Sequence, residues 1–404
     1  MKSQRIAIVG AGTAGLASAA LLARQGHSVV LFERAQSFQP VGTGVLLQPS
    51  GLGVLSELGV MDDMLRYGQR VDSLLGTTRL GRKIMQVEYA HLGVSTDLFG
   101  LGVHRAALCH VLHSAFASIS SRVYMGCEVR STEQQANSQL LHFLHNGQEH
   151  TEAFDAVLIA NGSASTLRPA TWVKYNKQYP WGAMWTIAPL TEQLTHFDQP
   201  SLQQKYDKAH TMVGMLPTGC SPDSMNQRMV SLFWSLPVAD IPEFHNPDFD
   251  FSSWKQNLSE FWPEVSPLLD ALHSPLQLLP ATYRDVVLSR WGQGRLGVIG
   301  DAAHAMSPQL GQGANMALLD ARSIADAIEE GKDWDDVWCH FHAQRAGSIR
   351  FYQIMSWLLT PLFQSRIPGA AFIRDFALPL SHKIPWLRQQ MAATVAGTKH
   401  GLFR

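Results

Sequence analysis

A glycine-rich turn near the N-terminus carries the first residues whose spacing suggests a chemistry. Gly10-Ala-Gly12-Thr-Ala14-Gly15 has the G-x-G-x-x-G pattern. Its first glycine permits a tight turn, its second lets the backbone approach a pyrophosphate, and its third allows a helix to pack closely on a strand. Glu33 follows at a distance that suits a carboxylate accepting hydrogen bonds from a ribose. These residues predict a dinucleotide site at a helix N-terminus, without separating NAD from FAD.

A second polar and glycine-rich segment near residue 300 favours a flavin. Gly300-Asp301 is followed by Met306-Ser-Pro308-Gln-Leu-Gly311-Gln-Gly313-Ala314-Asn315. An Asp at the end of a strand can reach a ligand hydroxyl in the crevice above a sheet. A turn that opens a helix presents bare N–H groups, which suit the negative charge that develops on the edge of a reduced flavin.

The elements around these residues follow the order of a Rossmann-like βαβ unit. The sequence predicts strands over 6–9 and 28–32, with a helix over 16–25 that ends at Gly26. Near the second segment it predicts a strand over 295–299 and a helix over 316–328. The predicted fold class is therefore α/β.

Composition excludes several other classes of protein. The 404 residues carry 32 basic against 33 acidic side chains, and only 16% are charged, where about 25% is usual. Nucleic-acid binding needs a basic face, so no nucleic-acid partner is expected. We find no apolar run of the ~18–20 residues that span a bilayer, no C-x-x-C pair and no signal peptide before the first strand. We therefore expect a cytoplasmic protein without a transmembrane span or a metal.

With these motifs the chain resembles the single-component FAD-dependent aromatic hydroxylases of the p-hydroxybenzoate hydroxylase and salicylate hydroxylase type. The resemblance extends to about residue 345. It rests on five motifs in the family's order: Gly10–Arg34, Val41–Gly59, His104–Leu112, Asp155–Arg168 and Gly300–Asn315. Two departures are Asn161, where the family carries Asp, and Ser50, where relatives often carry Asn. Asn161 bears on how the reductant binds more than on the FAD site.

The resemblance implies a monooxygenase in which NADH or NADPH reduces FAD transiently. A flavin C4a-hydroperoxide then inserts one oxygen atom from O2 into an aromatic or otherwise electron-rich apolar small molecule. No catalytic side chain is identified, because the flavin carries the chemistry. The expected cofactor-binding residues are Gly10, Gly12, Ala14, Gly15, Glu33, Arg34, Arg105, Asp301, Pro308, Gly311, Gly313, Ala314 and Asn315.

We expect a discontinuous FAD-binding domain formed by 1–72, 97–170 and 284–345. The inserted segments 73–96 and 171–283 would form a mainly β substrate domain, and 346–404 a C-terminal helical region. Six of the eleven Trp lie between residues 172 and 262 and none lies before 171, which suits a pocket for a flat apolar substrate. The candidate pocket residues are Gln48, Trp181, Trp185, Met212, Met215 and Phe233, of which strand alternation turns about half to each face.

Alternatives remain open. An epoxidase or quinone-pathway hydroxylase with a lipid-like substrate is one. A non-catalytic protein on the FAD fold is another, although Glu33, Arg105 and Asp301 argue against it. Trp181-Gly-Ala-Met-Trp185 departs from the W-x-W-x-I-P segment of flavin-dependent halogenases. The apolar tail favours a helical cover over the FAD domain, with peripheral membrane contact or dimerisation as the other interpretation, so the chain is expected to be a monomer or a homodimer.

Overall fold

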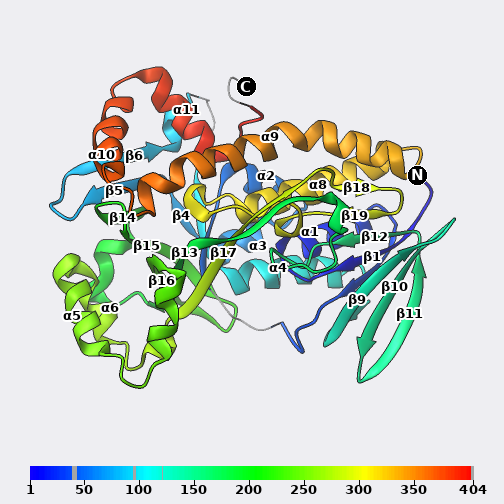
Figure 1. Cartoon of the computed structure of the whole chain (residues 1–404), viewed down its shortest axis with the longest axis horizontal. Helices are drawn as coiled ribbons and strands as arrows, with labels where there is room; N and C mark the ends of the chain where they lie inside the picture. Colours follow the sequence, from blue (N-terminus) through cyan, green and yellow to red (C-terminus); the bar gives the residue numbers. More distant parts are fainter. Residues whose placement is uncertain (39–42, 94–96, 121, 402–404) are drawn as a thin grey trace.

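The computed structural model describes residues 1–38, 43–93, 97–120 and 122–401. Val41 and Gly42 of the second predicted motif lie outside these residues. The described residues form four sheets that are flanked by helices (Figure 1).

A six-stranded sheet organises the N-terminal glycine turn. Its strand order is β18-β19-β12-β1-β2-β8, and all pairs are parallel except β18–β19. Ile6 pairs with Val29 on one side and with Ala156 on the other. Its strands are β1 (Arg5–Val9), β2 (Ser28–Phe32), β8 (Val123–Tyr124), β12 (Ala156–Ile159), β18 (Gly292–Gln293) and β19 (Leu296–Val298). Four of the five residues of β1 and of β2 are buried, as expected of parallel strands that are covered on both faces.

Helices cover this sheet, and α1 packs between α4 and α8. The first, α1, begins three residues before its predicted start, and α8 extends the predicted 316–328 helix at both ends, from Gly313 to Glu330 with Gly331 as its C-cap. The helices are α1 (Thr13–Arg24), α2 (Pro49–Glu57), α3 (Met61–Tyr67), α4 (Arg105–Ala117), α7 (Asp301–His304), α8 (Gly313–Glu330) and α9 (Trp334–Phe363).

Two three-stranded sheets flank this core. One has the order β3-β7-β4 and is entirely antiparallel, and the other is the twisted meander β11-β10-β9, which projects at one end of the molecule (Figure 1). Their strands are β3 (Gly44–Leu47), β4 (Gln69–Val71), β7 (Gly100–His104), β9 (Cys127–Gln134), β10 (Gln139–His145) and β11 (Gln148–Phe154).

A seven-stranded sheet contains most of the strands of the two inserted segments, which the sequence predicts to be mainly β. Its order is β17-β13-β16-β15-β14-β5-β6. The strands are β5 (Ser73–Thr78), β6 (Lys83–Glu88), β13 (Val173–Pro189), β14 (Ser201–Asp207), β15 (Thr211–Ser221), β16 (Ser224–Pro237) and β17 (Leu279–Leu288). The proposed domain division stays a prediction, and β17 runs across the proposed boundary at 283/284.

One face of this sheet is covered by α5 (Phe251–Phe261) and α6 (Ser266–Asp270). The sequence predicts one helix over 251–272, but the chain breaks at Trp262, whose φ is −143° and ψ is 84°. The residue that precedes a proline is disfavoured in the α conformation, and Pro263 follows. Short 3-10 turns complete the connections: η1 (Tyr89–Leu92), η2 (Ala170–Trp172), η3 (Glu192–Asp198), η4 (Val238–His245), η5 (Pro263–Val265), η6 (Pro275–Gln277) and η7 (Pro308–Leu310).

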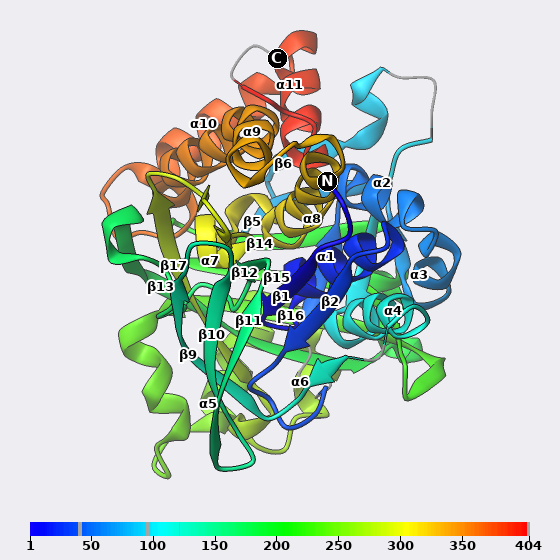
Figure 2. The same cartoon turned by 90° about the vertical axis from the view of Figure 1, so that its right-hand side faces the viewer.

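The C-terminal region is helical, as predicted. The long helix α9 lies along α8, α10 (Ala370–Ser381) packs on α9 and β6, and α11 (Pro385–Ala396) packs on η1 (Figure 2). The sequence predicts one apolar face from Ile354 to Phe363. Instead Phe363 is buried against Tyr206, whereas Ile354 is exposed, because residues nine apart lie on opposite sides of a helix. Within the described residues, no helix combines the length and the apolarity needed to cross a bilayer.

A buried ionic cluster ties the Gly300 turn to two helices. Asp320 lies in the middle of α8. Its Oδ2 accepts a hydrogen bond from the Gly300 N–H at 2.8 Å and lies 2.6 Å from His304 Nε2, and its Oδ1 accepts from Arg345 Nε on α9 at 2.8 Å. Burial alone would raise the pKa of this carboxyl. The charges of His304 and Arg345 outweigh burial and hold the pKa at about 2.

We expect Asp320→Asn to lower the free energy of unfolding by about 3–5 kcal/mol, because it leaves the buried Arg345 charge without a partner. Urea denaturation measures this loss. Since the folded pKa of about 2 lies below the unfolded value of 3.8, the carboxylate's contribution is complete above pH 3.8 and is lost as the pH falls through 2. Asp326→Asn, on the outer side of the same helix, is the control and should change stability by less than about 0.5 kcal/mol. Equal losses in the two variants would contradict this role of Asp320.

Candidate active site

The glycine turn leaves open space beside the N-terminus of α1. Gly10 has φ +106°, and a Cβ there would lie 2.6 Å from the Ala160 carbonyl oxygen. A Cβ on Gly15 would overlap the Gly10 carbonyl. A Cβ on Gly12, by contrast, would meet no described atom within 4 Å. Gly10 and Gly15 thus serve the turn and the packing, whereas Gly12 borders space that a ligand can fill.

Two helix N-termini carry no side-chain cap. In α1 the N-cap is Gly12 and in α8 it is Gln312, and neither first turn contains an acidic residue. The free N–H groups and the positive dipole end of such a terminus attract anions. Ala14 on α1 packs on the Gly300 turn, where a Cβ on Gly300 would lie 2.8 Å from its methyl group. The two predicted motifs therefore meet.

Glu33 lies at the end of β2, next to the glycine turn. Its carboxylate accepts hydrogen bonds from the Ala11 N–H at 2.7 Å and from the Ala35 N–H at 2.9 Å. A carboxylate offers about four acceptor positions, so capacity remains for the two hydroxyls of a ribose. Arg34 and Arg105 are both exposed, and Arg105 begins α4.

Asp301 begins α7 with an exposed side chain directly after Gly300. A Cβ on Gly313 would lie 3.8 Å from the Asp301 carboxylate. Pro308 begins η7, and Gly311 follows it with φ +61°. The Asp301 carboxylate and the turn that opens α8 therefore border the same region. Ala314 lies half-buried in the first turn of α8.

Asn315 is completely buried, and its side chain is engaged within the protein. Its Oδ1 accepts from the Gln48 N–H at 2.8 Å, and its Nδ2 donates to the carbonyls of Gly311 at 3.1 Å and Leu46 at 3.3 Å. The Asn315 side chain thus clamps the end of β3 onto the turn. Contact of this residue with the flavin stays a prediction.

Gln48 holds an amide group towards the same turn. It is fully buried and its Oε1 accepts from the Tyr89 hydroxyl, but its Nε2 has no hydrogen-bond partner within the described residues. A Cβ on Gly311 would lie 3.9 Å from that Nε2. A buried unpaired donor is costly, so the Gln48 amide fits a site whose ligand supplies the acceptor. Burial raises the pKa of the Tyr89 hydroxyl well above its usual range, which keeps it a neutral donor.

The C-terminal helix α11 closes over this turn. Gln312 Nε2 donates to the Val395 carbonyl at 2.6 Å. Gly397, the C-cap of α11, has φ +81°, and a Cβ there would overlap Ser50 Oγ. The helical cover favoured from the sequence is therefore present at this point. The small side chain of Ser50 allows the close approach that a larger Asn would hinder.

The candidate pocket residues divide between the two faces of the seven-stranded sheet. Trp185 and Phe233 form a tilted ring pair with centroids 4.8 Å apart, and Met212 joins them on the face away from α5 and α6. Met215 packs in the opposite core beneath α5 and α6. Alternation along β15 therefore places Met212 and Met215 on opposite faces, and the assignment of either residue to the substrate pocket stays a prediction. Trp181 is buried and stands four residues before Trp185 on β13, so the two side chains point to the same face of the sheet.

Tyr283 on β17 adds a polar group to that aromatic face. Its hydroxyl accepts a hydrogen bond from Trp185 Nε1 at 3.4 Å, and burial raises the pKa of the phenol. The neutral hydroxyl retains its own proton for donation. Sequence reasoning missed Tyr283, Tyr89 and Asp320, since each acts through a partner far away in the chain. Only Asp320 could have been found from the sequence, because it is a charged residue among the apolar positions of the predicted 316–328 helix.

His104 and Asn161 are not among the predicted cofactor residues. His104 caps α4, with its Nδ1 accepting from the Ala106 N–H at 3.1 Å. Within the described residues, no group of three or more His, Cys, Asp or Glu side chains is arranged to hold a metal. Asn161 is exposed, and its backbone lies against the Gly10 turn.

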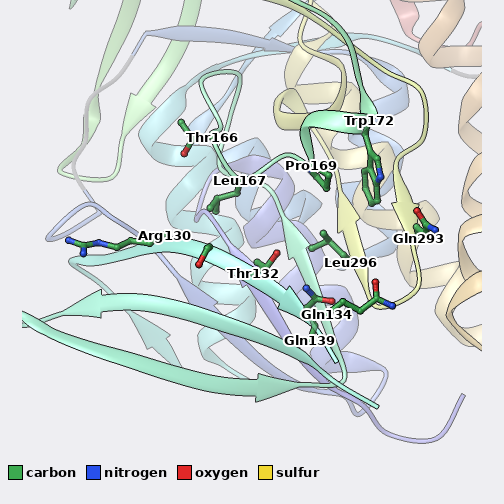
Figure 3. Close-up of a pocket in the computed structure, with 11 residues that line it drawn as sticks. Arg130, Thr132, Gln134, Gln139, Thr166, Leu167, Pro169, Trp172, Gln293 and Leu296 are labelled. Atoms are coloured by element: carbon green, nitrogen blue, oxygen red, sulfur yellow. The ribbon is translucent and has the colours of Figure 1, made fainter. Parts of the chain in front are cut away.

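A pocket of about 400 Å³ lies elsewhere, between the β9–β10 hairpin and the segment that leads to η2 (Figure 3). Arg130, Gln134, Thr166, Trp172 and Gln293 are among its lining residues. It contains none of the predicted cofactor residues, so the candidate active site does not depend on it.

We expect Gly12→Ala to leave the stability of the FAD-free protein unchanged, because its Cβ meets no described atom and φ is −78°. The dissociation constant for FAD should rise at least about tenfold, or ~1.4 kcal/mol, since the methyl group enters the predicted pyrophosphate space. Fluorescence titration measures affinity and thermal unfolding measures stability. Gly15→Ala is the contrasting variant, which should destabilise the FAD-free protein. Unchanged FAD affinity in Gly12→Ala would contradict the placement of the pyrophosphate.

Comparisons with known proteins identify the family of this chain. A family model described as FAD binding domain matches residues 3–331. The chain is 28% identical over 340 residues to 6-hydroxynicotinate 3-monooxygenase of Bordetella bronchiseptica, covering 81% of this chain and 83% of that protein. It is 26% identical over 392 residues to 2-heptyl-3-hydroxy-4(1H)-quinolone synthase of Pseudomonas aeruginosa, covering 92% of each.

The same fold occurs in a solved structure of Klebsiella pneumoniae HpxO complexed with FAD and uric acid. The TM-score is 0.80 at 20% identity, with 97% of each chain covered. The predicted fold class and FAD as the cofactor are thereby confirmed. This chain belongs to the FAD binding domain family.

Proposed function

We propose that this protein is an FAD-dependent monooxygenase that consumes NADH or NADPH and inserts one oxygen atom from O2 into an electron-rich aromatic ring. Two relatives from separate species are named as a monooxygenase of 6-hydroxynicotinate and a synthase of a 3-hydroxyquinolone. Both names describe nitrogen-containing aromatic rings with oxygen substituents. A flat heteroaromatic substrate of that class is therefore our choice for this protein.

The observation that carries the proposal is the aromatic face of the seven-stranded sheet, on the side away from α5 and α6. Trp185 and Phe233 form a ring pair against which a flat substrate would stack, and Met212 beside them is an adaptable apolar side chain. Bound FAD supplies the redox chemistry, because it accepts electrons from the nicotinamide and activates O2. The protein's part is to hold the substrate beside the flavin and to exclude water.

Polar groups would orient the substrate on this face. The Tyr283 hydroxyl is neutral and can donate to a ring oxygen or nitrogen, and the unpaired Gln48 amide can donate to the flavin or to the substrate. Backbone N–H groups at the N-terminus of α8 would stabilise negative charge on the reduced flavin edge. None of these steps requires a protein nucleophile.

An amphiphilic aromatic substrate is the second candidate. The quinolone named in one relative carries a heptyl chain, and the C-terminal helices of this protein expose large apolar side chains.

The protein would act in the cytoplasm, as a monomer or a homodimer, and its four free cysteines fit a reducing compartment.

Substrate-dependent consumption of NAD(P)H tests the reaction. Without a substrate, the purified yellow protein should oxidise NADH or NADPH slowly. With a hydroxypyridine or quinolone acceptor, the oxidation should be at least about tenfold faster, by a factor that depends on how well the acceptor fits the pocket. Mass spectrometry should detect one ¹⁸O from ¹⁸O2 in the product. Faster oxidation that yields only hydrogen peroxide with every acceptor would count against the proposal, as would a purified protein that binds no FAD.

Tyr283→Phe tests the proposed substrate contact. Loss of one hydrogen bond of about 0.5–1.5 kcal/mol should raise KM roughly two- to twelvefold, and more of the NAD(P)H consumed should appear as peroxide. Tyr175→Phe, an exposed position on β13, should leave both quantities unchanged. If Tyr283→Phe retains the parental KM and coupling, its hydroxyl does not contact the substrate.

A further inference from the structure

The C-terminal helices expose an unusual concentration of apolar side chains. Among the described residues, ten of the seventeen exposed large apolar side chains lie between residues 354 and 386. We refer to them as the C-terminal apolar face: Ile354, Trp357, Leu358, Ile367, Phe372, Ile373, Phe376, Leu380, Ile384 and Trp386. The helices that carry them form one edge of the molecule, at the upper left of Figure 1.

Helical spacing places these side chains together on α9 and on α10. Ile354, Trp357 and Leu358 stand three and four residues apart at the end of α9, so they share one face. Phe372 and Phe376 stand four apart on α10, and their rings stack with centroids 6.5 Å apart. Scattered apolar residues on a surface are ordinary, whereas a contiguous apolar patch indicates a contact surface.

The orientation of α10 is the reverse of that expected of a helix that only covers a core. Its Arg374 is fully buried, with the guanidinium over the Tyr206 ring at 4.8 Å and Nη1 donating to the Lys208 carbonyl at 2.8 Å. Phe372 is 75% exposed and Phe376 63%. The arginine anchors α10 to the seven-stranded sheet and holds its aromatic side outwards.

Charge is distributed unevenly along the chain. Residues 346–404 contain seven Lys or Arg and one Asp, a formal charge of +6. The other 345 residues contain 25 basic and 32 acidic side chains, a formal charge of −7. Arg374 and Lys399 of this region are buried, whereas Arg350, Arg366 and Lys383 are exposed. These exposed cations in the basic part of a nearly neutral protein favour an anionic partner.

Basic side chains lie beside the apolar face. Arg366 is 77% exposed, with the Asp240 carboxylate 3.8 Å away, and Lys383 is exposed between Leu380 and Ile384. The β5–β6 turn extends this surface. Leu80 at its tip is almost fully exposed, and Arg82 donates to the Asp375 carbonyl of α10 at 3.1 Å.

We propose that the C-terminal apolar face and the β5–β6 turn dock this protein on the surface of an anionic phospholipid bilayer. Trp and Phe suit the interface between headgroups and acyl chains, while Lys and Arg attract anionic headgroups. A second copy fits less well, because a two-fold dimer pairs the same patch of both subunits and would bring two basic surfaces together. The docking is independent of the reaction proposed above.

Flotation with lipid vesicles tests the docking. The full-length FAD-loaded protein should float with phosphatidylcholine vesicles that contain about one-third phosphatidylglycerol, and bind them at least about tenfold more tightly than pure phosphatidylcholine vesicles. Added salt should weaken the binding by screening the basic groups. Protein that stays with the aqueous fraction in the presence of anionic vesicles overturns the proposal.

Paired variants identify the face. Phe372→Ser with Phe376→Ser should reduce vesicle binding about tenfold or more while FAD content and thermal unfolding stay unchanged, because both side chains are exposed. Leu276→Ser, an exposed apolar position on η6 outside the face, should bind as the parent does. Equal vesicle binding by the double variant overturns the assignment. So does a parent that sediments as a dimer, binds no vesicles and becomes monomeric on the double substitution, since that result assigns the face to a second copy.

Discussion

The buried carboxylate of Asp320 is the interaction on which the arrangement of the candidate site depends. It holds the Gly300 N–H, His304 and Arg345 at once, and so joins the turn before Asp301 to both α8 and α9. A buried charge is tolerated only when its partners satisfy it. The position of Asp301 relative to α8 therefore follows from an ionic cluster inside the protein and not from the loop itself.

A second set of contacts brings separate segments of the chain to the same turn. Asn315 clamps the end of β3 onto Gly311, and Gln48 extends from there to Tyr89 in the 73–96 segment. Gln312 then binds the carbonyl of Val395 in α11. The turn that would lie along the flavin is thus supported by the end of β3, by the 73–96 segment through Gln48, and by the C-terminal helix α11. The unpaired amide of Gln48 is the polar group that remains for a ligand.

The C-terminal region combines two tasks that sequence reasoning set against each other. Its inner side packs on the seven-stranded sheet through Phe363 and Arg374, and Gly397 lies against Ser50 beside the turn that opens α8. Its outer side exposes Trp357 and Phe372 beside basic groups. A helix has enough circumference for both, because residues four apart share a side and residues nine apart do not. A cover over the site and a docking surface are therefore compatible in the same helices.

The sequence by itself determined the parts whose physics is local. The glycine spacing, the βαβ order, Glu33 and the Asp301 turn depend on backbone conformation and short periodicity, so the fold class, FAD as the cofactor and the local elements of the candidate site were predictable. Tertiary structure alone decided the rest. It assigned Met212 and Met215 to opposite faces of the sheet, buried Arg374 and exposed Phe372, and brought Tyr283 to Trp185. These outcomes depend on which element covers which face, and that is fixed by packing between segments far apart in the chain.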